Sequence, residues 1–169
     1  MLRAAAPMKI VCVGGGPASL YFSILMKQAF PQVSIEVYER NKADDTFGWG
    51  VVFSRETLGN LASRDPESYR QIESRFAYWD DIETYVGGQC ITSTGHGFCG
   101  LPRRELLLIL QARAQAVGVQ LNFQSELKPD QIPAADLVLA ADGVHSLMRE
   151  AGAAHFKPSL DWRKCKFIW

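Results

Sequence analysis

The 169-residue sequence predicts an α/β fold in which a parallel sheet is layered between helices. The first observation is a β-branched run over residues 9–13, followed at once by Gly14-Gly15-Gly16 and an amphipathic helical segment. The second is another apolar strand over residues 33–38, which completes a strand–helix–strand unit. The third is a pair of later apolar runs, one over residues 119–123 directly after a long helical segment over residues 103–117, and one over residues 135–141. This alternation is typical of a doubly wound, Rossmann-like sheet in three layers.

Composition excludes several classes of protein. Hydrophobic residues make up 47% of the chain and charged residues 21%, which is enough apolar material for a packed core. The 18 Lys and Arg residues balance the 18 Asp and Glu residues, so no basic excess indicates nucleic acid or an anionic membrane as a partner. The length corresponds to one domain, placed at residues 8–169, and residues 1–7 precede a second methionine and are expected to be a flexible extension.

Cysteine usage and the absence of a leader pattern favour a cytoplasmic protein. The four cysteines have no CxxC spacing and no histidine at metal-ligand spacing, so no metal site and no disulfide framework is predicted. The apolar stretch over residues 11–26 is interrupted by the glycines and Pro17. It therefore fits neither a signal peptide nor a membrane span.

The remaining elements follow from local patterns. The first helix should end near Phe30, before Pro31, and the polar residues 41–50 should form a loop. Short helices are expected over residues 55–61 and 66–72.

In the second half of the chain, short aromatic and β-branched segments alternate with glycine turns between residues 76 and 99, which predicts antiparallel strands as a layer attached to the main sheet. Residues 103–117 place leucines on one helical face, and Gly118 ends that helix. Strands are expected over residues 119–123 and 135–141.

The pattern Gly14-x-Gly16-x-x-Ser19 lies directly after a strand and opens a helix. Gly14 would allow the tight turn, and Gly16 lacks a Cβ, so a pyrophosphate can approach the helix N-terminus. Glu39 ends the second strand at the spacing expected for a ligand of ribose hydroxyls. The alternative interpretation is a glycine turn in another α/β protein, with Glu39 paired to a neighbouring cation on the surface.

A second motif follows the last predicted strand. Asp142-Gly143 comes first, with Ser146 and Arg149 at fixed offsets. An aspartate at the carboxyl end of a strand can accept a hydrogen bond from a ribose or ribitol hydroxyl. A plain Asp-Gly turn is the alternative.

A third motif, Arg103-Arg104, opens the long helix. Two cations at the positive end of a helix dipole are mildly unfavourable, which indicates an anionic partner.

In this order and spacing, the three motifs resemble the FAD-dependent aromatic-ring monooxygenases, the single-component flavoprotein hydroxylases. Arg103, Leu106 and Leu110 fit the start of the family's helix pattern. The loop over residues 44–53 and the stretch over residues 95–100 are most similar to the branch that contains salicyloyl-CoA 5-hydroxylase and 2-aminobenzoyl-CoA monooxygenase.

The resemblance implies a function and a set of cofactor-binding residues, but no catalytic residue. The chain would be the FAD-binding domain of an oxidoreductase that uses NADPH or NADH and O2 to hydroxylate an aromatic or aryl-CoA substrate. The implied FAD-binding residues are Gly14, Gly16, Pro17, Ala18, Ser19, Glu39, Arg40, Gly48, Trp49, Gly50, Val51, Arg103, Asp142 and Gly143.

Glu39 and the next residue bear on cofactor choice. A carboxylate repels a 2′-phosphate, so Glu39 favours the adenosine half of FAD over NADP. Arg40 is the candidate for the opposite preference, but alternation along a strand predicts that its side chain leaves on the other face.

The C-terminal part of the family pattern is missing. A downstream Gly-Asp motif is absent, and residues 166–169 resemble the start of a strand. Two alternatives to an active monooxygenase domain therefore remain: a nucleotide-binding module without catalysis, and one half of a split enzyme. The antiparallel strands should also expose an apolar face, which favours a dimer or a partner chain.

Overall fold

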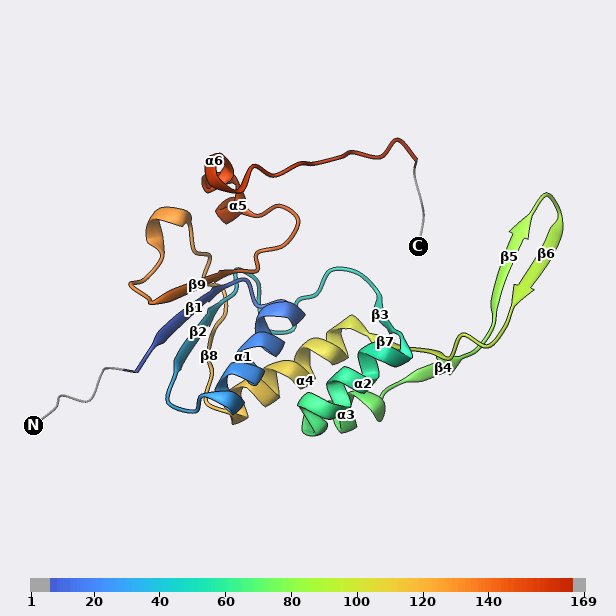
Figure 1. The fold of residues 1–169 in the computed structure, drawn as a ribbon, viewed down its shortest axis with the longest axis horizontal. Coiled ribbons are helices and arrows are strands. Elements are labelled where there is room, and N and C mark those ends of the chain that lie inside the picture. Colours follow the sequence, from blue (N-terminus) through green and yellow to red (C-terminus); the bar gives the residue numbers. More distant parts are fainter. Residues whose placement is uncertain (1–6, 166–169) are drawn as a thin grey trace, which may run out of the picture.

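The computed structural model describes residues 7–165 (Figure 1). Most of the predicted extension over residues 1–7 and the predicted strand start over residues 166–169 lie outside the described residues. Within the described part, no helix is both long and apolar enough to cross a membrane.

A four-stranded parallel sheet forms the centre of the fold, in the order β8-β2-β1-β9. Its strands are β1 (Lys9–Val13), β2 (Ser34–Tyr38), β8 (Gln120–Asn122) and β9 (Leu137–Ala140). β9 pairs with β1 from Ile10↔Leu137 to Val13↔Ala140, which confirms that the last predicted strand joins the first sheet. β1 therefore lies between β2 and β9.

Two long helices cover one face of this sheet, α1 (Pro17–Ala29) and α4 (Arg103–Ala116). Alternate residues of β1 and β2 point toward them, because side chains along a strand alternate between faces. This face contains most of the buried apolar side chains, including Ile10, Cys12, Ile35, Val37, Leu20, Ile24, Leu110 and Ala114.

The opposite face has a thinner cover than the predicted three layers suggest. Val11 and Val13 pack there against Met148 of the short helix α5 (Leu147–Ala151). The rest of this cover comes from residues near the 3₁₀ turn η1 (Pro129–Gln131), and a short helix, α6 (Ala153–Phe156), follows α5. These elements are too short to give an apolar periodicity in the sequence.

The predicted antiparallel strands are present, and the structure divides them between two sheets. One sheet has the order β3-β7-β4, with β3 (Gly50–Phe53), β7 (Phe98–Pro102) and β4 (Ala77–Trp79). A separate hairpin of β5 (Ile82–Val86) and β6 (Gln89–Ser93) extends away from the rest of the molecule (Figure 1). The helices α2 (Arg55–Arg64) and α3 (Pro66–Glu73) follow β3.

β3 lies partly where a loop was predicted. Gly50 ends the expected loop, yet Gly50 and Val51 pair with Pro102 and Leu101 of β7. The strand is formed through a partner distant in the chain, so local pattern gave no signal for it.

The hairpin exposes apolar side chains, as the sequence led us to expect. Tyr85 is 72%, Val86 63% and Ile91 60% exposed. A two-stranded hairpin is marginal by itself in water, so such surfaces favour further packing. The dimer or partner chain itself stays a prediction.

The sheet contains an ion pair that makes a pH dependence testable. Lys9 Nζ lies 2.9 Å from Glu36 Oε1, and the Tyr38 hydroxyl donates to Glu36 Oε2 at 2.7 Å. The Lys9 contact first, and then the Tyr38 hydrogen bond, lowers the pKa of Glu36 below its ordinary value of 4.5. A lowered carboxyl pKa stabilises the folded state above that ordinary value, and the contribution is lost as the pH falls through the folded pKa.

We therefore expect the wild-type chain to lose more stability than Glu36→Gln when the pH is lowered from about 6 to about 3. Urea unfolding of both proteins at each pH measures the difference. Equal losses in the two proteins would show that the ion pair does not contribute.

Candidate nucleotide-binding site

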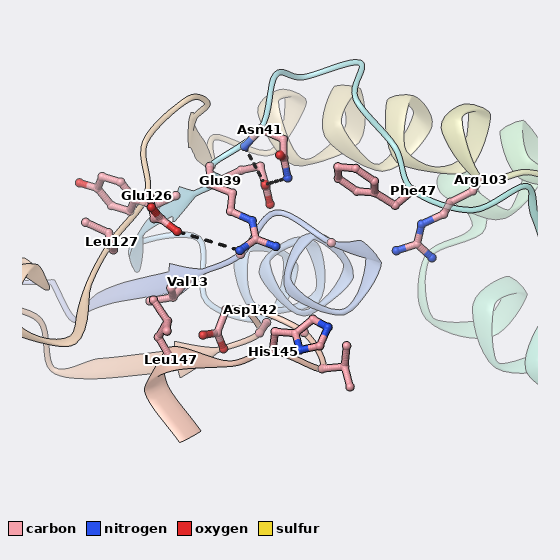
Figure 2. A pocket seen from close by; sticks show the side chains of 17 residues that line it. Val13, Glu39, Asn41, Phe47, Arg103, Glu126, Leu127, Asp142, His145 and Leu147 are labelled. Carbon is pink, nitrogen blue, oxygen red and sulfur yellow. Dashed lines mark hydrogen bonds and ion pairs between the residues drawn. The ribbon is translucent and has the colours of Figure 1, made fainter. Parts of the chain in front are cut away.

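A cavity of about 400 Å³ opens at the carboxyl ends of β1, β2 and β9 (Figure 2). In open parallel sheets this edge is where ligands bind, because the strand order changes direction there. Figure 2 shows Glu126 and Leu127 at one end of the cavity and Phe47 and Arg103 at the other. Its lining includes residues from all three motifs: Gly14, Gly16, Glu39, Arg40, Arg103, Asp142 and Gly143.

The two glycines of the motif have different surroundings. Gly14 is tightly packed, whereas Gly16 borders open space. Gly14 has φ +98°, and a Cβ there would lie 2.3 Å from the carbonyl oxygen of Ala141. At Gly16 a Cβ would meet nothing within 4 Å, so this backbone borders open space. Gly16 is also the N-cap of α1, and no side chain caps that end. The uncapped start of the helix therefore borders an opening where an anion can bind.

The Glu39 carboxylate has protein partners on both oxygens. Its Oε2 accepts from the Gly15 N–H at 2.7 Å. Its Oε1 accepts from the backbone N–H of Asn41 at 2.9 Å and from Asn41 Nδ2 at 2.6 Å. Glu39 thus ties the glycine loop to the segment after β2, and Oε2 keeps lone-pair capacity for one more donor. Sequence reasoning did not find Asn41, because a polar residue in a loop carries no pattern.

Arg40 also lines this cavity, which corrects the expectation that it would point away from Glu39. β2 ends at Tyr38, so the two-residue alternation of a strand no longer applies at Glu39 and Arg40. One guanidinium nitrogen of Arg40 lies 4.0 Å from Glu126 Oε1, and both side chains are about half exposed. Such a pair is weak and can be rearranged by a ligand.

Asp142 lines the cavity and has one carboxylate oxygen without a partner. Its Oδ2 accepts from the Met148 N–H at 3.3 Å, whereas its Oδ1 is buried and has no hydrogen-bond partner. The loop around it is fixed by Ser146, which caps the Arg149 N–H at 2.9 Å, and by Arg149, which donates to the Val144 carbonyl. A buried acceptor without a donor is costly, so Oδ1 fits a ligand hydroxyl.

The chain was compared with known proteins. No protein-family model matches the chain. It is 42% identical over 163 residues to salicyloyl-CoA 5-hydroxylase of a Streptomyces species, covering 96% of this chain and 32% of the hydroxylase. It is 33% identical over 172 residues to protodeoxyviolaceinate monooxygenase of Chromobacterium violaceum, covering 96% of this chain and 44% of that enzyme. The chain is therefore similar to part of two proteins that are named as a hydroxylase and a monooxygenase.

Solved structures show the same fold. Tetrameric 2-methyl-3-hydroxypyridine-5-carboxylic acid oxygenase matches with a TM-score of 0.73 and 24% identity, over 86% of this chain and 42% of the oxygenase. CtdE in complex with FAD matches with a TM-score of 0.68 and 19% identity, over 86% of this chain and 40% of CtdE. The chain spans about a third to less than half of the length of the monooxygenases it matches.

Some residues predicted for the site lie elsewhere in this structure. Pro17 and Ala18 line a different groove, and the Ser19 side chain is fully buried. The segment from Gly48 to Val51 does not line the cavity, although a Cβ at Gly48 would lie 3.9 Å from the Arg103 side chain. Trp49 is 83% exposed. The structure thus brings the glycine loop, Glu39, Arg40, Arg103 and Asp142 together and leaves Trp49 outside.

Proposed function

We propose that this chain is the FAD-binding part of a flavoprotein monooxygenase that uses NADPH or NADH and O2 to hydroxylate an aromatic or aryl-CoA substrate. The observation that carries the proposal is a cavity that combines the open backbone of Gly16 at an uncapped helix start with the unpaired Asp142 Oδ1. The name of the 42% identical hydroxylase supports an aryl thioester of coenzyme A as substrate class.

Each lining group has a role that its chemistry allows. The N–H groups at the start of α1 bind the pyrophosphate, assisted by the positive end of the helix dipole. Glu39 Oε2 accepts from a ribose hydroxyl, and Asp142 Oδ1 accepts from a ribityl hydroxyl. The guanidinium of Arg103 supplies positive charge at the far end of the cavity from Leu127 (Figure 2). The chemistry supplied by bound FAD is hydride acceptance and activation of O2.

Glu39→Ala tests the cofactor assignment. It removes a ribose ligand and also releases Gly15 and Asn41, so the loop that binds the pyrophosphate is no longer fixed. We expect the dissociation constant for FAD, measured by titration at constant salt, to rise about tenfold to a hundredfold. Glu56→Ala, an exposed change in α2 away from the cavity, is the control and should bind FAD like the wild type. An unchanged constant in Glu39→Ala would remove Glu39 from the site.

Two other functions are compatible with the same cavity: a nucleotide-binding module without catalysis, and one half of a split enzyme. NADPH oxidation by the flavin-loaded protein, with and without salicyloyl-CoA, separates these functions. Oxidation stimulated by the thioester supports the monooxygenase. FAD binding without turnover supports the module, and turnover only after addition of a second polypeptide supports the split enzyme.

A further inference from the structure

Asn41 makes two hydrogen bonds to one oxygen of the Glu39 carboxylate. Its backbone N–H donates to Glu39 Oε1 at 2.9 Å, and its side-chain Nδ2 donates to the same oxygen at 2.6 Å. The amide nitrogen must be the atom that faces Glu39, because an ionised carboxylate only accepts hydrogen bonds. Figure 2 shows both contacts beside the cavity, which Asn41 also lines.

Backbone contacts fix Asn41 in this place. The Gln124 N–H donates to the Asn41 carbonyl at 3.0 Å, and the Ser125 N–H donates to the Glu39 carbonyl at 2.8 Å. These bonds join the segment after β2 to the segment after β8. Gln124 has φ +53°, a conformation that residues other than glycine rarely adopt and that persists only where the surrounding structure holds it. The Asn41 amide therefore has a defined position next to Glu39.

The two oxygens of Glu39 differ in what they can still accept. A carboxylate oxygen offers about two lone-pair positions. Asn41 fills both positions on Oε1, whereas Oε2 accepts only the Gly15 N–H, at 2.7 Å, among residues 7–165. The neighbouring cation, Arg40, has its guanidinium directed to Glu126 Oε1 instead, at 4.0 Å. Within the described chain, Glu39 thus has one acceptor position left for a ligand, and it is on Oε2.

We propose that Asn41 determines specificity: by filling Oε1, it limits Glu39 to one of the two hydroxyls of an adenosine ribose. The inference rests on the proposed function, in which Glu39 binds that ribose. The 2′- and 3′-hydroxyls lie on adjacent carbons, so a carboxylate with both oxygens free could accept from both together. With Oε1 occupied, the site distinguishes a nucleotide that lacks one hydroxyl from a nucleotide that lacks the other.

The probes are ADP, 2′-deoxy-ADP and 3′-deoxy-ADP, titrated into the full 169-residue chain by calorimetry at constant salt. For the wild type, we expect one deoxynucleotide to bind about tenfold more weakly than ADP and the other to bind within about threefold of ADP. In Asn41→Ala, the backbone N–H groups of residues 15 and 41 still hold the carboxylate, and Oε1 gains a free position. Both deoxynucleotides should then bind about tenfold more weakly than ADP.

Asn41→Asp keeps the shape of the side chain but places a second carboxylate next to Oε1, which repels Glu39 from its position. ADP and both deoxynucleotides should then bind alike, within about threefold. In the ligand-free protein, hydrogen exchange of the Gly15 N–H, measured by NMR, should become about fivefold faster because Oε2 moves away from it. Asn60→Asp, the same change at an exposed site in α2, is the control and should behave like the wild type.

Circular dichroism checks that each variant is folded, and Asn41→Ala decides the matter alone if Asn41→Asp does not fold. The inference is overturned, with the proposed function intact, if FAD and ADP bind the wild type but the two deoxynucleotides bind it equally well. It is also overturned if the Asn41 variants keep the wild-type pattern. A wild-type chain that binds neither FAD nor ADP would contradict the proposed function, and this inference with it.

Discussion

Replacing Gly14 with alanine is expected to lower the free energy of unfolding by about 3 kcal/mol, as the sum of a backbone and a steric cost. The backbone cost arises because φ at Gly14 is +98°, a region that residues with a Cβ rarely adopt. The steric cost arises because the new Cβ would lie 2.3 Å from the Ala141 carbonyl oxygen, at the end of β9. The strands β1 and β9 would have to separate at the edge that forms the nucleotide cavity.

Urea denaturation with linear extrapolation measures this loss. Gly16→Ala is the matched control, because a Cβ there meets nothing within 4 Å and Gly16 has φ −74°. We expect Gly16→Ala to change stability by less than about 0.5 kcal/mol, although its methyl group enters the cavity and weakens FAD binding. If Gly14→Ala were as stable as Gly16→Ala, the close approach to Ala141 would not exist in solution.

Asp65→Ala is expected to lower the free energy of unfolding by about 3–5 kcal/mol, because it leaves a charged partner without compensation. The carboxylate lies at the junction of α2 and α3 and is fully buried. Its Oδ1 accepts from Gln28 Nε2 at 2.9 Å and from an Arg113 guanidinium nitrogen at 3.2 Å. These contacts join three parts of the helical layer: α1, the α2–α3 junction and α4.

The double variant Asp65→Ala with Arg113→Met separates loss of the pair from loss of packing. Removing both charges should recover part of the stability, since a buried ion pair contributes little beyond a well-packed apolar replacement. Stability is again read from urea denaturation. A single Asp65→Ala variant that loses less than about 1 kcal/mol would show that Asp65 is solvated or free of Arg113 in solution.

Much of the fold could be predicted where the signal is local. The strand before the glycines and the helix after them were predicted correctly. At Gly14 a short continuous apolar run, typical of a buried strand, is followed by the apolar spacing of a helix. The helix predicted over residues 103–117 is α4, Arg103–Ala116, for the same reason. That β9 joins the sheet of β1 was also predicted, because its apolar run is typical of a buried parallel strand, but the sequence did not say which strand it would pair with.

Local sequence patterns predicted less where a strand pairs with a segment that is distant in the chain. β3 was not predicted as a strand, and its first residue, Gly50, was placed in a loop, since the strand is ordered by β7 and not by its neighbours in the chain. The hairpin β5–β6 was predicted as part of one layer, because alternation within a strand does not say which sheet the strand joins.

For the candidate site, the sequence by itself determined the types of chemistry: a glycine turn with an open backbone at Gly16, a carboxylate at Glu39, and an Asp-Gly turn at Asp142. These depend on residue type and short spacing. Only the tertiary structure decided which groups meet. It placed Arg40 in the same cavity as Glu39, gave Glu39 its partner Asn41, and left the buried Oδ1 of Asp142 without a partner. The physical reason is that these contacts form beyond the ends of the strands, where no periodicity links the sequence to the direction of a side chain.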